Sequence, residues 1–219
     1  MSRSPQLQEK LLKCKHLGLS AYEEVWREME TFTNERSAET IDEVWLVEHP
    51  RVFTLGQAGK DEHILDAGDI PVIKTDRGGQ VTYHGPGQLV AYLLFDLRRL
   101  GINVRELVSG IETAIISLLA EYKIEAQAKK EAPGVYVGER KIAALGLRIR
   151  HGCSYHGLSL NIDMDTAPYK RINPCGYADM EIVQLRDLAV KNSMDEVCED
   201  LLSHIQRQFG YTSLIHLIH

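Results

Sequence analysis

The chain has 219 residues, of which 44% are hydrophobic, so we expect one domain over residues 1–219 rather than two. Its net charge of −6 argues against nucleic-acid binding, because phosphate recognition needs a basic face. Residues 1–15 lack the apolar run of a signal peptide, and no later segment is apolar over the length that spans a bilayer. We therefore predict a cytoplasmic protein that does not enter membranes.

Three amphipathic helices are predicted from capping boxes, in which a side chain able to cap the first turn precedes a Glu by three residues. The boxes are Ser20 with Glu23, Asn103 with Glu106, and Ser193 with Glu196. Apolar residues at helical spacing follow each box, so each predicted helix has one face to bury.

Short runs rich in branched and aromatic residues, bounded by Gly and Pro, predict strands between these helices. The runs are 43–49, 52–55, 72–75, 89–97, 134–137, 142–149 and 158–162. Residues 138–140 predict a hairpin turn, which places Lys141 at the start of the next strand. Because the strands cluster between helices instead of alternating with them, we predict an α+β fold with a mixed, largely antiparallel sheet and flanking helices.

The segment from Arg77 to Gln88 combines Gly and Pro with polar residues directly after a predicted strand. Glycines let the backbone approach a ligand and expose N–H donors, so Gly78 and Gly79 are candidate donors to an oxyanion. The alternative is a set of hairpin and bulge glycines with no ligand. A phosphate-binding P-loop is excluded, because the Gly-Lys-Ser/Thr ending is missing.

Lys141 stands at the edge of the small, apolar run at residues 142–147. Burying an ammonium group costs solvation, so a Lys in such a place is a candidate to accept or share a proton. The alternative is a strand-end Lys whose amine reaches solvent.

Cys175 lies between Pro174 and Gly176, which predict a sharp bend that exposes the thiol. A thiolate held there beside a cation or backbone donors is a competent nucleophile. Most single cysteines are small buried hydrophobes instead, and we interpret Cys14 and Cys198 in that way. The four cysteines are widely spaced with no Cys-x-x-Cys, so we expect reduced thiols and no disulfide framework.

A zinc site is the alternative suggested by His151, Cys153 and His156, with His84 as a fourth ligand. The spacing of these residues matches none of the usual paired-ligand patterns. We therefore predict no metal site.

Taken in order, these segments resemble the octanoyltransferase family of lipoate biosynthesis, also called lipoyl(octanoyl) transferases or lipoate-protein ligase B. The similarity takes in residues 48–50 and 54–56, then 77–88, then 133–135 with 141–146, then 154–161, and ends at 174–176. Each motif is moderately specific, whereas the ordered set is strongly so.

The resemblance implies a fold like that of the biotin and lipoate protein ligases, and a two-step transfer. Cys175 would take an octanoyl group from the phosphopantetheine thioester of acyl carrier protein, and Lys141 would lower the pKa of the thiol. A lysine on a lipoyl domain of a 2-oxoacid dehydrogenase complex, or of the glycine cleavage protein, would then receive the acyl group. Neither step would need ATP, a metal or another cofactor, and we expect a monomer.

The resemblance also implies an acyl pocket built from three segments. These are Arg77, Gly78, Gly79, Gln80, Val81, Thr82, Tyr83 and His84; Ala144, Leu145 and Gly146; and Gly157, Leu158 and Ser159. We expect the acyl tail to lie against Leu145, Leu147 and Leu158.

Acyl carrier proteins are acidic, so we expect a basic patch near the entrance of the acyl pocket. Its candidate residues are Arg140, Arg148, Arg150, Lys170 and Arg171. The alternative is an ordinary solvated face on an acidic protein.

Two other functions compete with this one. An ATP-dependent lipoate-protein ligase of the same fold needs a phosphate-binding loop and a Lys but no nucleophilic Cys, so the bend at Cys175 favours the transferase. A noncatalytic zinc or acyl-carrier binding module is the second alternative.

Overall fold

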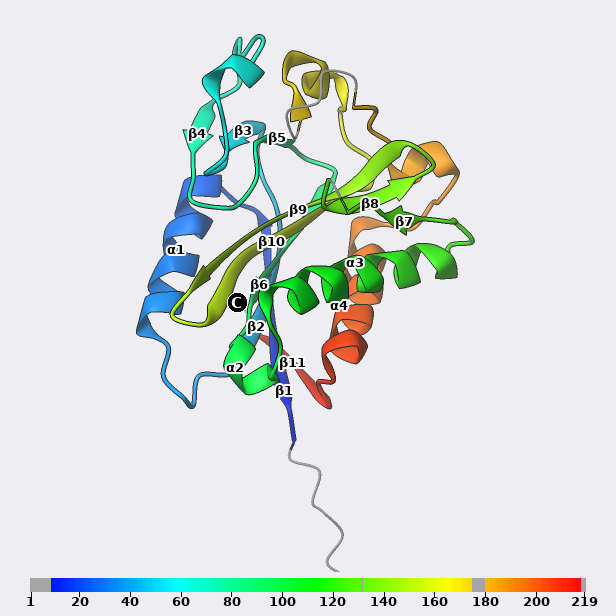
Figure 1. The fold of residues 1–219 in the computed structure, drawn as a ribbon. Coiled ribbons are helices and arrows are strands. Elements are labelled where there is room, and N and C mark those ends of the chain that lie inside the picture. The colour runs from blue at the N-terminus through cyan, green and yellow to red at the C-terminus, as the bar shows by residue number, and fades with distance from the viewer. Residues whose placement is uncertain (1–8, 131, 175–179, 218–219) are drawn as a thin grey trace, which may run out of the picture.

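The structure, a computed structural model, describes residues 9–130, 132–174 and 180–217 as two sheets flanked by helices (Figure 1). The large sheet has the strand order β11-β1-β2-β6-β10-β9-β8-β7, and the small sheet has the order β4-β3-β5. β1 pairs in parallel with β2 and β11, as β3 does with β4, and the other pairs are antiparallel. The predicted α+β class with a mixed, largely antiparallel sheet is confirmed.

The elements have the following bounds. The strands are β1 Leu11–Leu19, β2 Asp42–Glu48, β3 Val52–Leu55, β4 Val72–Lys74, β5 Val81–His84, β6 Gln88–Leu94, β7 Gln127–Ala128, β8 Gly134–Val137, β9 Arg140–Arg150, β10 Cys153–Asn161 and β11 Ser213–Leu217. The helices are α1 Tyr22–Glu35, α2 Leu97–Leu100, α3 Val104–Glu121 and α4 Met194–Phe209, with short 3₁₀ turns at Asp61–His63, Ala167–Arg171 and Leu185–Leu188.

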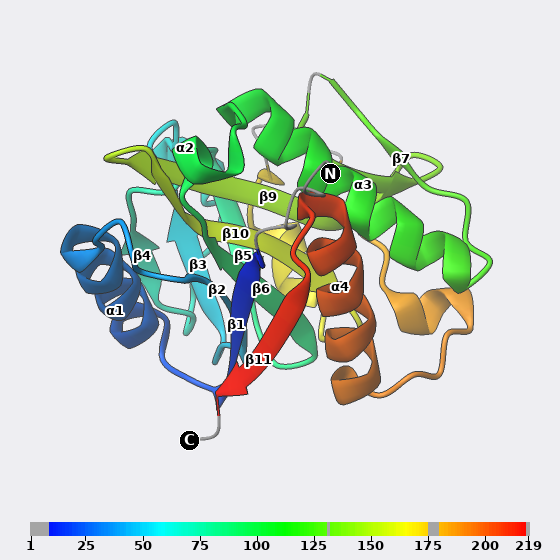
Figure 2. The same cartoon turned by 90° about the horizontal axis from the view of Figure 1, so that it is seen from below.

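Helices cover both faces of the large sheet. α3 and α4 pack on one face over a continuous apolar core, which includes Leu93, Ile115 and Leu201. α1 packs on the opposite face over a smaller cluster that includes Met29 and Trp45. Figures 1 and 2 show α1 on the other side of the sheet from α3 and α4.

Two of the three predicted capping boxes are confirmed, at Asn103 with Glu106 and at Ser193 with Glu196. The prediction for the first helix is wrong at its start, because α1 begins at Tyr22 with no side-chain cap. The Ser20 hydroxyl instead donates to the Leu17 carbonyl, 2.6 Å away.

Three strands of the large sheet, β1, β7 and β11, were not predicted. β1 and β11 were missed because each carries one His, and β1 also two Lys residues, among its apolar ones. The Gly-rich segment also contains a strand, β5, which pairs with β3. The hairpin between β8 and β9 is confirmed, with Val137 opposite Arg140, so Lys141 is the second residue of β9.

The pairing of β9 with β10 decides what each face of the sheet presents. Gly146 lies opposite Gly157, and Ala144 opposite Ser159. Side chains alternate along a strand, so these small residues share one face and the leucines between them share the other. None of the helices in the described ranges is long and apolar enough to cross a bilayer.

Candidate active site

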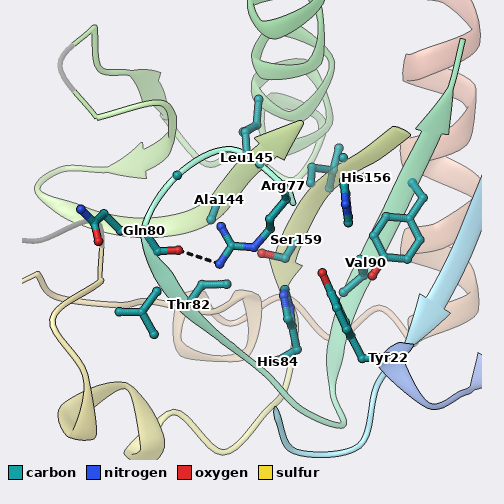
Figure 3. Close-up of a pocket in the computed structure, with 16 residues that line it drawn as sticks. Tyr22, Arg77, Gln80, Thr82, His84, Val90, Ala144, Leu145, His156 and Ser159 are labelled. Carbon is teal, nitrogen blue, oxygen red and sulfur yellow. Dashed lines mark hydrogen bonds between the residues drawn. The ribbon is translucent and has the colours of Figure 1, made fainter. Parts of the chain in front are cut away.

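A narrow cavity of about 60 Å³ lies on the α1 face of the large sheet, over β9, β10 and β6. Figure 3 shows Arg77, His84 and Tyr22 around it. Its lining contains Tyr22, Arg77, Gly79, Gln80, Val81, Thr82, His84, Val90, Tyr92, Ala144, Leu145, Gly146, His156, Gly157, Leu158 and Ser159. The structure thus brings the three predicted pocket segments to one cavity.

Arg77 holds the Gly-rich loop in place. Its Nε donates to Thr54 Oγ1 at 3.0 Å, and its Nη2 donates to the carbonyls of Thr54 at 2.6 Å and Gln80 at 2.7 Å. A Cβ on Gly56 would lie 2.4 Å from the Gly79 carbonyl, so a larger residue there would push the loop away. These acceptors satisfy the buried guanidinium of Arg77. The same hydrogen bonds hold the Gly-rich loop against β3.

His84 is held as a neutral ring with a defined tautomer. The Asn161 amide donates to the Val183 carbonyl, so its oxygen accepts from Gln88 Nε2. The remaining Gln88 oxygen therefore accepts from His84 Nδ1, 2.7 Å away. Burial lowers the pKa of His84 to about 3, with the charges of His49 and Arg77 adding to the effect.

His49 is the second neutral imidazole on this face. Its Nδ1 donates to the Ser20 carbonyl at 2.7 Å, and its Nε2 accepts from the Tyr92 hydroxyl at 2.7 Å. Burial lowers the pKa of His49 to about 4. The two imidazoles are therefore neutral at neutral pH, whereas Arg77 in the cavity wall is charged.

His156 joins a carboxylate at the end of the cavity. Its Nε2 lies 2.8 Å from Asp76 Oδ1, and Asp76 also accepts from Trp26 Nε1 and the Tyr155 hydroxyl. Burial raises the pKa of Asp76, but hydrogen bonds led by that of His156 outweigh it and hold the value at about 2. His156 has a φ of 57°, so the strand carries local strain at this point.

Lys141 is buried, with 3% of its surface exposed, so the alternative of a solvent-reaching Lys is wrong. Its Nζ lies 5.3 Å from the centre of the Tyr136 ring. A Cβ on Gly134 would come within 2.6 Å of Lys141 Cε, so Gly134 makes room for the side chain. Glu112 accepts from the Gly134 N–H at 3.0 Å, and burial raises its pKa against the lowering effect of Lys141.

Cys175 lies outside the described residues, but Lys141 shares a cavity with Pro174 before it and pairs with the backbone after residues 175–179. Pro174 and Lys141 line one small cavity, which shares Thr82, Ala144 and Ser159 with the larger one. After residues 175–179, the Glu181 carbonyl accepts from the Lys141 N–H at 2.8 Å, and the Val183 N–H donates to the Lys141 carbonyl at 3.0 Å.

Two predicted pocket residues do not line the cavity. Tyr83 points to the opposite side of β5, where it packs on Phe53 and Tyr169. Gly78 donates its N–H to the Leu147 carbonyl at 2.9 Å, so the prediction of Gly78 as an oxyanion donor is wrong.

The expected contact of an acyl tail with leucine side chains is also wrong. Leu145, Leu147 and Leu158 pack into the core under α3 and α4, on the other face of the sheet. Figure 3 shows Leu145 pointing away from the cavity. The floor of the cavity is instead made by the small residues Gly146 and Ser159 with the backbone around them.

Four lining residues were not among the sequence predictions. They are Tyr22, Val90, Tyr92 and His156. His156 stands inside a motif that carries the family resemblance, which is a signal that sequence reasoning passed over. In the sequence, Tyr22, Val90 and Tyr92 resemble ordinary core residues. Only the packing of α1 against β6 shows that they line the cavity.

The predicted basic patch is partly neutralised. Arg150 forms an ion pair with Glu30 at 3.2 Å, and Arg171 binds Asp69 at 3.3 Å. Arg148 donates to Gln57 Oε1 at 2.8 Å. Charge for docking an acidic partner is therefore smaller than the sequence indicates.

The zinc alternative at residues 151–156 is not formed. His156 is directed to Asp76, and within the described ranges three metal-ligating groups come within 4.8 Å of one another only at Cys14, His16 and His216. That cluster lies on the α4 face of the sheet.

The architecture is that of the lipoate and biotin protein ligases. A lipoate protein ligase from T. acidophilum with bound lipoic acid superposes with a TM-score of 0.76 and 15% identity, over 97% of this chain and 91% of that one. Biotin protein ligase from Aquifex aeolicus in complex with biotin and ATP superposes with a TM-score of 0.57 and 13% identity, over 93% and 71%. At such identities the likeness shows the fold alone.

Sequence comparison shows the family. The lipoyl protein ligase A/B catalytic domain matches residues 21–206. An octanoyltransferase from Shewanella putrefaciens is 59% identical over 210 residues, 96% of both chains. The chain belongs to this family, in its octanoyltransferase branch, and is therefore an acyltransferase.

Proposed function

We propose that the protein transfers an octanoyl group from acyl carrier protein to a lysine of a lipoyl domain, through a thioester on Cys175. The observation that carries the proposal is the position of Lys141 between the two flanks of the Cys175 segment. Pro174 lines a cavity with Lys141, and one peptide step of about 3.8 Å separates the Cα atoms of Pro174 and Cys175. We propose that the Cys175 thiol, which follows Pro174 in the sequence, and the Lys141 amine act on a common reacting carbonyl.

In the first step the Cys175 thiolate attacks the thioester carbonyl of the donor. The bond from carbon to the phosphopantetheine sulfur breaks, and that sulfur leaves as a thiol by taking the proton of the Lys141 ammonium, which becomes a neutral amine. A Lys141 ammonium favours the thiolate, because an opposite charge nearby stabilises the ionised form.

In the second step the amine of the acceptor lysine attacks the acyl-enzyme. An amide bond forms, the bond from carbon to the Cys175 sulfur breaks, and the proton lost by the amine passes to Lys141 or to the departing thiolate. Thioester exchange is nearly neutral, and transfer from sulfur to an amine is downhill. We therefore propose that the reaction uses no ATP, metal or other cofactor.

The acyl chain is proposed to lie over the small-residue floor made by Gly146 and Ser159, against the neutral rings of His84 and Tyr22. Each buried CH₂ contributes about 0.8 kcal/mol, so the end of the cavity can select chain length. The donor and acceptor proteins of such an enzyme meet it in the cytoplasm. The lipoyl domains concerned are those of the 2-oxoacid dehydrogenase complexes and the glycine cleavage protein.

The test is the intact mass of the protein after incubation with octanoyl-acyl carrier protein. The wild type should gain one octanoyl group that hydroxylamine removes, and Cys175→Ser should gain none. Cys153→Ser is the matched control, since that thiol is buried away from the cavity. An octanoyl adduct that persists on Cys175→Ser with full turnover would show that another residue carries the acyl group.

The ATP-dependent ligase alternative is separated by the same assay. Transfer from octanoyl-acyl carrier protein should proceed at the same rate with and without ATP. A reaction that requires ATP and free octanoate would support the ligase and overturn the proposed transfer.

A further inference from the structure

Four groups with metal-ligating chemistry converge on the face of the large sheet opposite the cavity. Cys14 and His16 are two residues apart on β1 and so share a face of the sheet. His216 on β11 is the register partner of Cys14. Glu199 on α4 reaches over both rings, with Oε1 at 3.5 Å from His16 Nε2 and Oε2 at 3.9 Å from His216 Nε2. Figure 2 shows β1, β11 and α4 side by side.

The sulfur and imidazole atoms are already close. The ligand atoms of Cys14, His16 and His216 all lie within 4.8 Å of one another. In a tetrahedral zinc site with bonds of about 2.0–2.3 Å, neighbouring ligand atoms are about 3.3–3.6 Å apart. The Glu199 carboxylate is near that spacing from the two imidazoles, at 3.5 and 3.9 Å, but lies outside the group of three, so its side chain must rotate toward the Cys14 sulfur to become the fourth ligand.

One side of the cluster is buried in the protein and the other is open to solvent. Cys14 is fully buried beneath it, whereas the side chains of His16, His216 and Glu199 are 40%, 45% and 54% exposed. An ion can therefore enter from solvent and meet the thiol last. The two rings stack at 5.9 Å between centres with an interplanar angle of 19°, and the Nε2 atoms of both lie near the Glu199 carboxylate.

We propose that Cys14, His16, His216 and Glu199 bind a Zn²⁺ ion that ties β11 to β1 and α4. One thiolate, two neutral imidazoles and one carboxylate form a set of donors that zinc accepts in tetrahedral geometry. The site is separate from the acyl cavity and serves stability. The sequence hides it, because the ligands come from positions 14, 16, 199 and 216 with no local pattern.

Metal binding at this site must displace a proton. Zinc binds a cysteine as the thiolate, so the Cys14 thiol gives up its proton on binding. The affinity for zinc should therefore increase with pH.

The test is titration of the full-length protein with Zn²⁺ alone, in competition with a chromophoric chelator, in a Cys175→Ser background that removes the proposed active-site thiol. One equivalent should bind and raise Tm. His216→Ala, at the exposed strand edge where folding is least at risk, should weaken binding by at least about tenfold, the loss caused by removing even an outer-shell partner. Replacement of Zn²⁺ by Co²⁺ should give the near-ultraviolet band of a cobalt thiolate.

Controls make the outcome decisive. Cys153→Ser and His151→Ala remove a buried thiol and an exposed imidazole outside the cluster, and should leave affinity unchanged. Cys14→Ser should abolish the cobalt thiolate band. The proposal is overturned if His216→Ala binds zinc as the parent does, or if the band survives in Cys14→Ser.

Discussion

The two faces of β9 and β10 differ in packing, although residues that are neighbours in the sequence contribute to them in turn. On the α1 face, Ala144, Gly146 and Ser159 leave a cavity, whereas on the opposite face Leu145 and Leu158 fill a core against α3 and α4. Neighbouring positions on one strand therefore carry separate roles. We expect substitutions on the α1 face to change activity, and those on the α3 and α4 face to change stability.

The largest effect is expected at Lys141, at the edge of the cavity face. Lys141→Met keeps most of the length of the side chain and removes the charge and the proton-transfer group, so octanoyl transfer should slow by about 10²–10⁴-fold. Arg140→Met, one residue earlier and only half-buried, is the matched control and should stay within a few-fold of the wild type. A Lys141→Met enzyme that keeps a tenth or more of the activity would contradict the role given to the amine.

The adjacent pair Leu158 and Ser159 sharpens the comparison directly. Leu158→Ala removes a fully packed side chain on the α3 and α4 face and should lower the free energy of unfolding by about 2–5 kcal/mol. Ser159→Ala, on the cavity face, should cost far less stability. Urea denaturation of both variants measures the difference, and equal losses would show that the cavity face is as tightly packed as the core.

Gly146 tests how closely the cavity fits a chain. A Cβ there would lie 3.0 Å from the Gly78 carbonyl and 3.1 Å from Arg77 Cδ. Gly146→Val should therefore narrow the slot and reduce transfer of an octanoyl group by about tenfold, the loss expected when about two CH₂ groups lose their place. Butanoyl transfer by the same variant is the control, since a short chain leaves the far end empty; equal loss with both donors would contradict a chain-length role.

The effect that is smallest at neutral pH concerns the buried imidazoles of the cavity face, and it grows as the pH falls. The folded-state pKa values of His84, about 3, and His49, about 4, lie below the ordinary value of 6.5. The unfolded chain therefore binds more protons, and the free energy of unfolding should fall as pH falls from about 6.5 toward 4, by up to about 1.4 kcal/mol per pH unit for each ring. His49→Gln and His84→Gln should each flatten this dependence, measured by urea denaturation at several pH values. His151→Gln, at an exposed turn, should leave it unchanged.

Local signals in the sequence predicted the parts of the fold that local chemistry decides. The capping boxes at Asn103 and Ser193 were correct because the cap and the Glu that completes it lie within one turn. Ser20 failed because its hydroxyl has a competing acceptor in the Leu17 carbonyl. The strands β1 and β11 were not predicted, because pairing between distant segments, rather than composition, makes them strands.

The sequence motifs predicted which segments form the candidate site. They did not predict toward which face of the sheet each side chain points. Period-two alternation shows that Leu145 and Gly146 face opposite ways, but the cavity had to be seen before one face could be chosen. The same limit applied to Tyr83, which shares β5 with His84 and points to the other side. The cluster at Cys14 could not be predicted for a further reason. β11 brings His216 to Cys14 from 202 positions away in the sequence.

The parallel pairing of β1 with β11 has a consequence for how the protein is made. Leu11 pairs with Ser213, so β1 leaves the ribosome about 200 residues before its outer neighbour. At synthesis rates of about 5–20 residues per second, one edge of the large sheet stays open for about 10–40 seconds. During that interval β1 exposes unpaired backbone groups, and the nascent chain is at its most vulnerable to joining a strand from another molecule.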